Sequence, residues 1–436
     1  MHHHQVTLSF FVAFSIISLF VTYKISGYGP LDVTNTKVCS GNGKIYADRP
    51  NVCDCYNCFD GPACENVTPN CIINDIGGNP ELHQQYWETN YDAISKSSIM
   101  VRSDYRTGYE HASHMIYEDD TKNTWSTITP EINKAIRQLH KQVKNAEVDG
   151  YSIVLGTGGT GVITAAIWAL TQIANNKEPT RVFARTPFFG AYRNWANLYP
   201  TVTHWNASYD QQDFQDNLIE FITSPNNPTG KVDWEPHYKQ GKLQVHDMVY
   251  YWPSLTDTSK YPPLNKDIMV FSLSKLTGHA GTRFGWALVK DKKVAEKMSE
   301  FITRVQVHTS IDAQFRALTV IKHLIGTQGD VFFNFIKTSL QSRWKRILEL
   351  FEKPVMKKHF AVESEPDQFY LWIKCINVDQ PCYILMAKNG LLGWDGNDFG
   401  SPVGQYVRLE MVVRDSVFEI LLIRLEEIGN KLETKK

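Results

Sequence analysis

Six polar side chains in the middle of the sequence have the types and the order needed to bind a phosphorylated aromatic aldehyde. In chain order they are Asn227, Asp247, Tyr250, Ser272, Lys275 and Arg283. A lysine can hold such an aldehyde as a Schiff base and then move a proton at the substrate Cα, which requires an amine that is partly neutral at working pH. An acid can pair with a pyridinium nitrogen and keep the ring electron-poor. The set predicts a pyridoxal phosphate site, with Lys275 as the catalytic residue and Asp247 at the ring nitrogen.

The other residues of the set have tasks at the two ends of this cofactor. Asn227 and Tyr250 are expected to hydrogen-bond the ring oxygen. The residues expected to hold the phosphate are Gly159, Thr160, Ser272 and Arg283. An arginine suits a phosphate because its guanidinium can bind two oxygens at once.

The glycine-rich loop GTGGTG at Gly156–Gly161 supplies the first two phosphate residues. It lies between a predicted strand and a predicted helix, and N–H groups at such a helix start bind phosphate well. The loop is neither a Walker loop nor a convincing Rossmann fingerprint, so on its own a tight structural turn explains it equally well. Taken singly, the other residues also have plain explanations: a solvated lysine, an Asn-Pro turn and a helix-capping aspartate. Their joint order and spacing favour the cofactor site.

The elements that must position these residues are those of an α/β domain. From Ile73 onward, short β-branched runs alternate with helical stretches, a pattern typical of a largely parallel sheet. The predicted strands are Ser152–Leu155, Arg181–Arg185, Ile219–Thr223, Leu243–His246, Ile268–Leu273, Phe284–Val289, Gln368–Lys374 and Tyr406–Val412. The predicted helices are Val162–Ile173, Lys292–Gln306, Asp312–Ile325, Val331–Phe351 and Val417–Leu432. The candidate residues follow strand carboxyl ends, where open α/β sheets bind ligands.

Length and composition indicate a globular protein of several domains. The chain has 436 residues, which favours two or three domains. Its 45 basic and 46 acidic side chains lack the basic excess of a nucleic-acid-binding protein, so no nucleic-acid partner is expected. Its 11 Trp, 20 Tyr and 22 Phe exclude a disordered chain.

Residues Val6–Tyr23 form an uncharged, mostly apolar stretch. A buried core helix is one explanation, but a signal peptide or an uncleaved signal anchor over residues 1–26 fits the position better. Either would send the chain into the secretory pathway, to the ER lumen, the vacuole or the cell exterior. An anchor would make it a single-pass membrane protein with a lumenal catalytic domain. Sequons at Asn66 and Asn206 are compatible with glycosylation on that route.

Six of the eight cysteines lie between Cys39 and Cys71, and the other two are Cys375 and Cys382. A zinc site usually draws on paired C-x2-C units or histidines, but this segment has one such pair and no histidine. No metal site is predicted, and disulfides are favoured. A segment this short buries too little apolar surface to fold without cross-links. Spacing alone leaves their connectivity open.

The cysteine-rich segment CSGNG-KIYADRPNVCDCYNCFDGPAC resembles the EGF-like module at the N-terminus of plant alliinases. The resemblance includes the Ser-Gly-Asn-Gly after the first cysteine and the C-x-C-x2-C core, and it places the module at residues 37–72. It implies the disulfides Cys39–Cys53, Cys55–Cys64 and Cys58–Cys71, with Cys375–Cys382 as a fourth bridge in the main domain.

The rest of the chain is similar to the alliinase C-terminal domain, whose family also holds the plant tryptophan aminotransferase-related proteins. The motifs that carry the similarity are GNPELHQQYW, TSPNNPTG, SKLTGHAGTRFGWALVKD and YVRLEMV. The resemblance covers residues 73–436 and implies the PLP-dependent transferase fold type I. That fold has a mainly parallel large domain and a smaller α+β domain, here expected mainly from 73–110 and 330–436. The resemblance also implies that Arg408 binds the substrate α-carboxylate and that the protein is a homodimer.

Three positions depart from the family pattern. Gly78-Asn79-Pro80 stands where the family has Gly-Asp-Pro, and Thr160-Gly161-Val162 stands where its phosphate loop continues Thr-Gln-Leu. His114 stands where the family has a tyrosine that reaches the neighbouring subunit's cofactor, and Tyr117 lies three residues further on. We expect either His114 or Tyr117 to take that role, or the active site to be altered.

Two reactions fit this residue set. An aminotransferase would convert an L-amino acid, with an aromatic or tryptophan-like side chain preferred, to its 2-oxo acid and would use a second 2-oxo acid as co-substrate. An alliinase-type C–S lyase would cleave an S-alkyl-L-cysteine or its sulfoxide to pyruvate, ammonia and a sulfur product. We expect the aminotransferase, because it is the broader branch and a substrate without a Cβ leaving group can only be transaminated. A non-catalytic extracellular binding protein is the least favoured reading, since every matched cofactor position carries a competent residue.

Overall fold

The chain divides into two compact units, Met1–Thr68 and Pro69–Lys436. The computed structural model describes residues 39–46, 49–69, 71–78, 80–90, 128–174, 179–198, 203–205, 218–237 and 243–434. No helix within these ranges is long and apolar enough to cross a membrane. Five features singled out in the sequence lie outside the described residues: the apolar stretch Val6–Tyr23, Asn79, His114, Tyr117 and Asn206.

The described residues of the first unit form short strands and bury few apolar side chains. Its strands are β1 (Gly43–Tyr46) paired with β2 (Arg49–Cys55), and β3 (Phe59–Asp60) paired with β4 (Asn66–Val67), both antiparallel. Its buried apolar side chains are Cys39, Cys58, Phe59 and Cys64. Half-cystines thus make up most of the interior, and cross-links stabilise a unit too small for a conventional core.

Disulfides in both units follow the pairs that the family resemblance implies. Cys39 is bonded to Cys53 and Cys55 to Cys64 in the first unit, and Cys375 to Cys382 in the second. Cys58 and Cys71 are disulfide-bonded as well, so all eight cysteines are oxidised.

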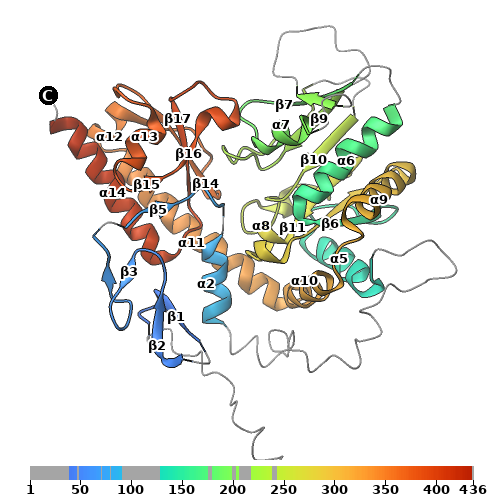
Figure 1. Ribbon diagram of the computed structural model, residues 1–436, viewed down its shortest axis with the longest axis horizontal. Helices are drawn as coiled ribbons and strands as arrows, with labels where there is room; N and C mark the ends of the chain where they lie inside the picture. Colours follow the sequence, from blue (N-terminus) through green and yellow to red (C-terminus); the bar gives the residue numbers. More distant parts are fainter. Residues whose placement is uncertain are drawn as a thin grey trace, which may run out of the picture. The chain divides into compact units, whose positions relative to one another are not determined.

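The larger unit contains a seven-stranded sheet that confirms the predicted α/β architecture (Figure 1). In spatial order the strands are β6 (Ser152–Thr157), β12 (Phe284–Val289), β11 (Ile268–Ser272), β10 (Leu243–Asp247), β9 (Leu218–Thr223), β7 (Thr180–Ala184) and β8 (Thr203–Trp205). Neighbouring strands are parallel except around β12, which is antiparallel to both β6 and β11. β11 and β12 are mostly apolar and buried at every residue, as expected for strands covered on both faces of the sheet.

Helices α6 (Gly158–Ala174) and α9 (Lys292–Gln306) pack on each other and on the sheet, and Figure 1 shows them side by side. The helix α5 (Pro130–Val143) packs against α10 (Ile311–Leu324). Helix α6 begins four residues before the predicted start at Val162, so the second half of the glycine-rich loop is the first turn of the helix. The first turn of any helix keeps N–H groups without an intrahelical acceptor, so these glycines can still bind an anion.

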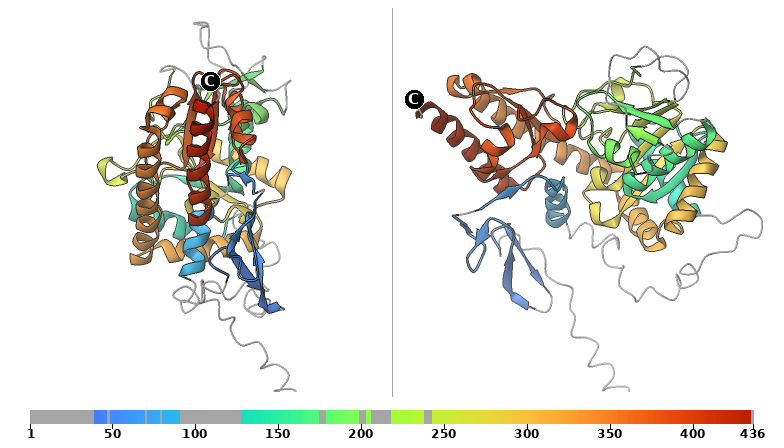
Figure 2. Two further views of the ribbon diagram at one scale, coloured as in Figure 1. Left: turned by 90° about the vertical axis from the view of Figure 1, so that its left-hand side faces the viewer. Right: turned by 45° about the horizontal axis from the view of Figure 1, so that its top comes forward.

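A second lobe of the larger unit, coloured orange to red in Figure 2, is built on a four-stranded antiparallel sheet. Its strands, in spatial order, are β13 (Phe360–Val362), β14 (Tyr370–Cys375), β17 (Tyr406–Glu410) and β16 (Trp394–Asp395). Its helices are α11 (Thr327–Phe351), α12 (Pro354–His359), α13 (Cys382–Ala387) and α14 (Asp415–Thr434). The short strand β5 (Ile73–Asn74), which precedes α2 (Glu81–Thr89), pairs in parallel with β15 (Leu391–Leu392). The start of the unit is therefore anchored on its C-terminal part.

Arg343 on α11 hydrogen-bonds the chain just after β17 and so holds the helix against it. We expect Arg343→Met to lower the free energy of unfolding by about 2–4 kcal/mol. The buried guanidinium donates to the carbonyls of Met411 (2.6 Å) and Val413 (2.7 Å), which the variant leaves without that donor. Urea denaturation measures the change. Arg346→Met removes a more exposed pair with Glu419 and should cost less than about 1 kcal/mol. Equal losses in the two variants would contradict this account of Arg343.

Candidate functional site

A cavity of about 320 Å³ opens where β9, β10 and β11 end, at the edge of the sheet that the sequence indicates. The predicted cofactor residues all line it: Gly159, Thr160, Asn227, Asp247, Tyr250, Ser272, Lys275 and Arg283. Arg408, from β17 of the second lobe, lines it too. The site therefore lies between the two lobes, and both are needed to form it.

One end of the cavity is the first turn of α6. Gly158 begins this turn with a φ of +70°, and a Cβ on it would overlap the Arg283 guanidinium. Glycine is therefore required for the arginine to lie against the turn. Arg283 donates to the carbonyls of Ala280 (3.2 Å) and Thr157 (3.4 Å), which holds its charge beside the free N–H groups of the helix. This combination is suited to a phosphate.

Two serines border the same end of the cavity. Ser272 is the N-cap of α8 (Leu273–Thr277), and its Oγ accepts a hydrogen bond from the Ser274 N–H (3.2 Å). Its O–H can still donate to a ligand. Ser274 also lines the cavity but was not predicted, although the spacing Ser-x-Ser-Lys is visible in the sequence.

Asp247 lies at the end of β10 and is only 3% exposed. Its Oδ1 accepts from the Val249 N–H (3.2 Å), and its Oδ2 accepts from the hydroxyl of Tyr192 on α7 (Ala191–Ala196). Burial raises the pKa of Asp247 to about 6, and the Tyr192 hydrogen bond opposes that rise. A cation beside the carboxylate would offset the cost of burial, which suits a protonated ring nitrogen.

A chain of hydrogen bonds joins the remaining predicted residues. Arg408 Nη1 donates to Asn227 Oδ1 (3.0 Å), and Asn227 Nδ2 donates to the Tyr250 hydroxyl (3.4 Å). The Tyr250 hydroxyl is also hydrogen-bonded to that of Tyr370 on β14 (2.8 Å). The side chains expected at the ring oxygen are thus directly linked to the one expected at the substrate carboxylate.

The Arg408 side chain is 1% exposed and is surrounded by rings. Its Cζ lies 4.0 Å from the ring centroid of Tyr370, 4.8 Å from that of Trp394 and 5.1 Å from that of Phe399. Its Nε and Nη2 have no hydrogen-bond partner within the described part of the chain. Two neighbouring unpaired N–H groups on a buried guanidinium are suited to a carboxylate bound through both oxygens.

Lys275 reaches the cavity from the short helix α8. Its Nζ donates to the carbonyl of Gly78 at 2.5 Å, so a residue just before α2 closes this side of the site. Burial raises the pKa of both Asp247 and Glu410, and the charge of Lys275 opposes that rise in each.

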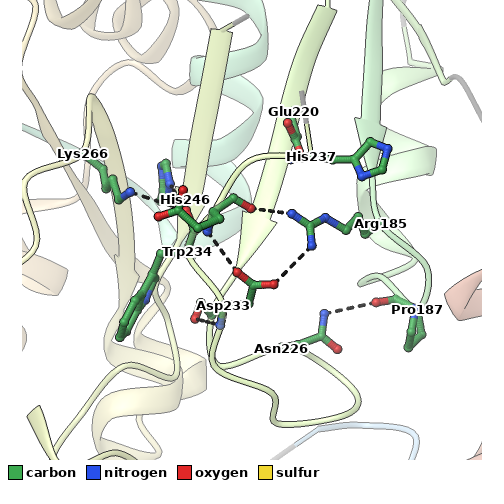
Figure 3. A network of polar contacts seen from close by, with 11 residues as sticks. Arg185, Pro187, Glu220, Asn226, Asp233, Trp234, His237, His246 and Lys266 are labelled. Carbon is green, nitrogen blue, oxygen red and sulfur yellow. Dashed lines mark hydrogen bonds and ion pairs between the residues drawn. The ribbon is translucent and has the colours of Figure 1, made fainter. Parts of the chain in front are cut away.

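The segment Ser224–Gly230, which carries the predicted asparagine, is fixed from outside the cavity by a polar network (Figure 3). Asn226 Nδ2 donates to the carbonyl of Pro187 (3.1 Å), and Arg185 pairs with Asp233 (3.1 Å). These contacts join the chain after β7 to the chain after β9. They set the position of the loop independently of any ligand.

Two of the three departures from the family pattern fall partly or wholly outside the described residues, namely Asn79 and the pair His114 and Tyr117. The third, Gly161, has a local explanation. A Cβ on Gly161 would lie 2.7 Å from Gln306 Nε2, and the Oε1 of that glutamine accepts from the Thr157 hydroxyl (2.6 Å). Glycine at position 161 leaves room for Gln306, at the end of α9, to hydrogen-bond Thr157 at the end of β6.

The arrangement fits pyridoxal phosphate in three respects. An anion-binding helix start lies beside an arginine, a buried and hydrogen-bonded acid lies at the end of the central strand, and a lysine lines the same cavity. All of these groups line a single cavity.

Comparison with known proteins identifies the family. The family model of the alliinase C-terminal domain, described as Allinase, matches residues 73–429. Tryptophan aminotransferase-related protein 4 of Arabidopsis thaliana is 31% identical over 89% of this chain and 86% of its own. Alliin lyase of Allium cepa var. aggregatum is 29% identical over 93% of this chain and 94% of its own. The aspartate aminotransferase structure from Thermotoga maritima shares the fold, with a TM-score of 0.57 and 17% identity over 82% of this chain and 92% of that one. The chain belongs to the alliinase family and is a pyridoxal phosphate-dependent enzyme of fold type I, either an aminotransferase or a carbon–sulfur lyase.

Proposed function

We propose that this enzyme is an L-amino-acid aminotransferase that prefers aromatic side chains and uses a 2-oxo acid as its co-substrate. The observation that carries the proposal is the apolar and aromatic part of the cavity lining. Phe189, Trp195 and Trp394 belong to it together with the aliphatic Ile76. Aromatic and aliphatic walls favour a large apolar substrate side chain, because they bury its surface and contact its ring.

In this proposal the residues of the large lobe hold the cofactor. Gly159, Thr160, Ser272 and Arg283 bind its phosphate, Asn227 and Tyr250 its ring oxygen, Asp247 its ring nitrogen, and Lys275 attaches it covalently. When bound, pyridoxal phosphate supplies an electron-withdrawing ring that makes the substrate Cα–H acidic.

The second lobe binds the substrate. Arg408 holds the α-carboxylate through Nε and Nη2, while its Nη1 stays on Asn227. The aromatic side chains around the guanidinium exclude water and strengthen that contact. Lys275 Nζ then takes the proton from the substrate Cα and returns it later in the reaction.

A carbon–sulfur lyase is the second candidate, because the alliin lyase named above is nearly as similar to this chain as the aminotransferase-related protein. Its reaction begins with the same proton removal by Lys275. It differs only in that a sulfur leaving group at Cβ departs, which requires no additional side chain. The distinction therefore depends on which substrate the cavity accepts.

The decisive experiment supplies the purified holoenzyme with either of two substrates. With L-tryptophan we expect continued formation of the 2-oxo acid only when 2-oxoglutarate is present as amino acceptor, because without it the enzyme keeps the amino group after the first turnover. With an S-alkyl-L-cysteine sulfoxide and no acceptor we expect little pyruvate or ammonia. Faster release of pyruvate and ammonia from the sulfoxide would replace the proposal with the lyase. A reconstituted protein without visible absorbance or either activity would favour a non-catalytic binding protein.

We also infer the organisation and the route of the chain. Residues 1–26 act as a signal peptide or signal anchor, residues 37–72 as an EGF-like module and residues 73–436 as the catalytic domain. The oxidised state of all eight cysteines supports passage through the secretory pathway, since disulfides persist in oxidising compartments. Asn66 on β4 is exposed and so accessible to glycosylation there. The working form is a homodimer in which His114 or Tyr117 reaches the neighbouring site.

A further inference from the structure

Two carboxyl groups, Asp75 and Glu410, are buried next to each other beside the substrate end of the cavity. Asp75 directly follows β5 and is 2% exposed, and Glu410 ends β17 and is 3% exposed. The Glu410 N–H donates to Asp75 Oδ2 (3.2 Å), while Glu410 Oε1 has no hydrogen-bond partner within the described ranges. An ionised carboxylate is costly to bury without partners, so this pair either holds protons or draws on a nearby cation.

Two of the three cations that line the cavity, Arg408 and Lys275, lie beside this pair. Glu410 is two residues beyond Arg408 on the same strand, so the two side chains lie on the same face of β17. Glu410 Oε1 and Lys275 Nζ each lie within 3.5 Å of the point that a Cβ on Gly78 would occupy. The Glu410 carboxyl of the second lobe and the Lys275 amine of the large lobe thus both lie close to Gly78. Gly78 lines the cavity together with Arg408.

The charges that face the pair come from three elements: α2, α8 and β17. Glu81 on α2 is a third acid, and Arg408 and Lys275 are the bases. Burial raises the pKa of Asp75 to about 7. Burial, followed by repulsion from Asp75, raises the pKa of Glu410 to about 8, and the two bases only partly oppose this rise. The pair therefore keeps protons in the neutral range.

We propose that the Asp75–Glu410 pair competes with the substrate α-carboxylate for the charge of Arg408, and does so only after losing protons. This inference rests on the proposed role of Arg408 in binding that carboxylate. With the pair protonated, the two unpaired N–H groups of Arg408 are available to the substrate. With the pair ionised, its negative charge neutralises the guanidinium and repels an incoming carboxylate.

The direction of the pH effect follows from linkage. The protonated pair favours the ligand-bound state, so binding of a carboxylate takes up protons. Affinity is therefore highest on the acid side of the pair's pKa values and falls as the pH rises through them. The fall is at most about tenfold per pH unit for each proton taken up.

The test measures binding of 3-phenylpropanoate, an unreactive carboxylate without an amino group, to the holoenzyme by titration calorimetry between about pH 6 and about pH 9. For the wild type, Kd should rise by about tenfold or more across this range. For the double variant Asp75→Asn/Glu410→Gln, whose amides keep the shape but cannot ionise, Kd should change by less than about threefold. The neutral 3-phenylpropanamide should show no such pH dependence with either protein.

Parallel pH dependence in the wild type and the double variant would overturn the inference. So would the absence of net proton uptake by the wild type, measured near neutral pH in two buffers of different ionisation enthalpy, and that measurement needs no variant to fold. Arg408→Gln separates this inference from the proposed function. If that variant binds the carboxylate as tightly as the wild type, the assigned role of Arg408 fails, whatever the pH dependence.

Discussion

Replacing Lys275 with alanine is expected to give a folded protein that no longer holds its cofactor covalently and whose kcat is lower by about 10³-fold or more. Lys275 is the one lysine among the described residues that line the cavity, and its Nζ donates to the Gly78 carbonyl. No neighbouring amine can take over the attachment or the proton transfer. Visible absorbance of the purified protein and the protein mass after borohydride reduction measure the attachment, and steady-state kinetics measure kcat.

Lys275→Arg is the matched control, because it keeps a positive charge opposite Gly78 but cannot attach an aldehyde as the amine does. It should lose as much activity as the alanine variant while unfolding at the wild-type temperature. An alanine variant that keeps the wild-type absorbance, or more than about a tenth of the wild-type kcat, would remove Lys275 from its assigned role.

The part of the site between Asp247 and Arg283 could be predicted because its residues are close in sequence and follow buried strands. β10 and β11 are short strands whose middle residues are buried, and the polar residues at and just after their last positions must emerge at the carboxyl edge of the sheet. Spacing alone then brings Asp247, Ser272 and Lys275 to one edge. The same logic gave the sheet strands to within a residue or two at most ends.

The groups that tune the site could not be predicted, because their partners come from distant segments. Tyr192 meets Asp247 across 55 residues, and Asp75 meets Glu410 across 335. No periodicity indicates which of many buried polar residues will pair after folding. The helix α5 was not predicted either, but its apolar residues recur at helical spacing, so the sequence does contain a signal for it.

The residue types of the site do not distinguish transamination from elimination, and the reason is physical. Both reactions need the same electron-withdrawing cofactor and the same base at the substrate Cα, so both select the same side chains around Lys275. In the proposed function, what differs is the fit of the substrate side chain against the cavity lining that includes Phe189, Trp195 and Trp394, and this fit depends on the shape of the lining. Shape is set by packing between the lobes rather than by a motif.

Replacing Asp247 with asparagine should lower kcat/KM by about 10²- to 10³-fold, because removing one member of a buried ion pair costs about 3–5 kcal/mol. The amide has the shape of the carboxylate and can keep the Val249 contact, but it carries no charge to hold a proton on the ring nitrogen. Steady-state kinetics with the preferred amino acid measure the loss. A variant within about tenfold of the wild type would show that the acid is not paired with a cation during the reaction.

Tyr192→Phe separates the charge of Asp247 from its placement. This variant keeps the carboxylate but removes the hydroxyl that donates to Oδ2, and a hydrogen bond to a charged group is worth about 1.5–3 kcal/mol. We expect a loss in kcat/KM of about tenfold, with the cofactor still bound. The loss should be smaller than in Asp247→Asn, because a misplaced charge still stabilises a nearby cation whereas a neutral amide does not. If the two variants lose activity equally, the hydrogen bond from Tyr192, rather than the charge alone, is what makes Asp247 effective.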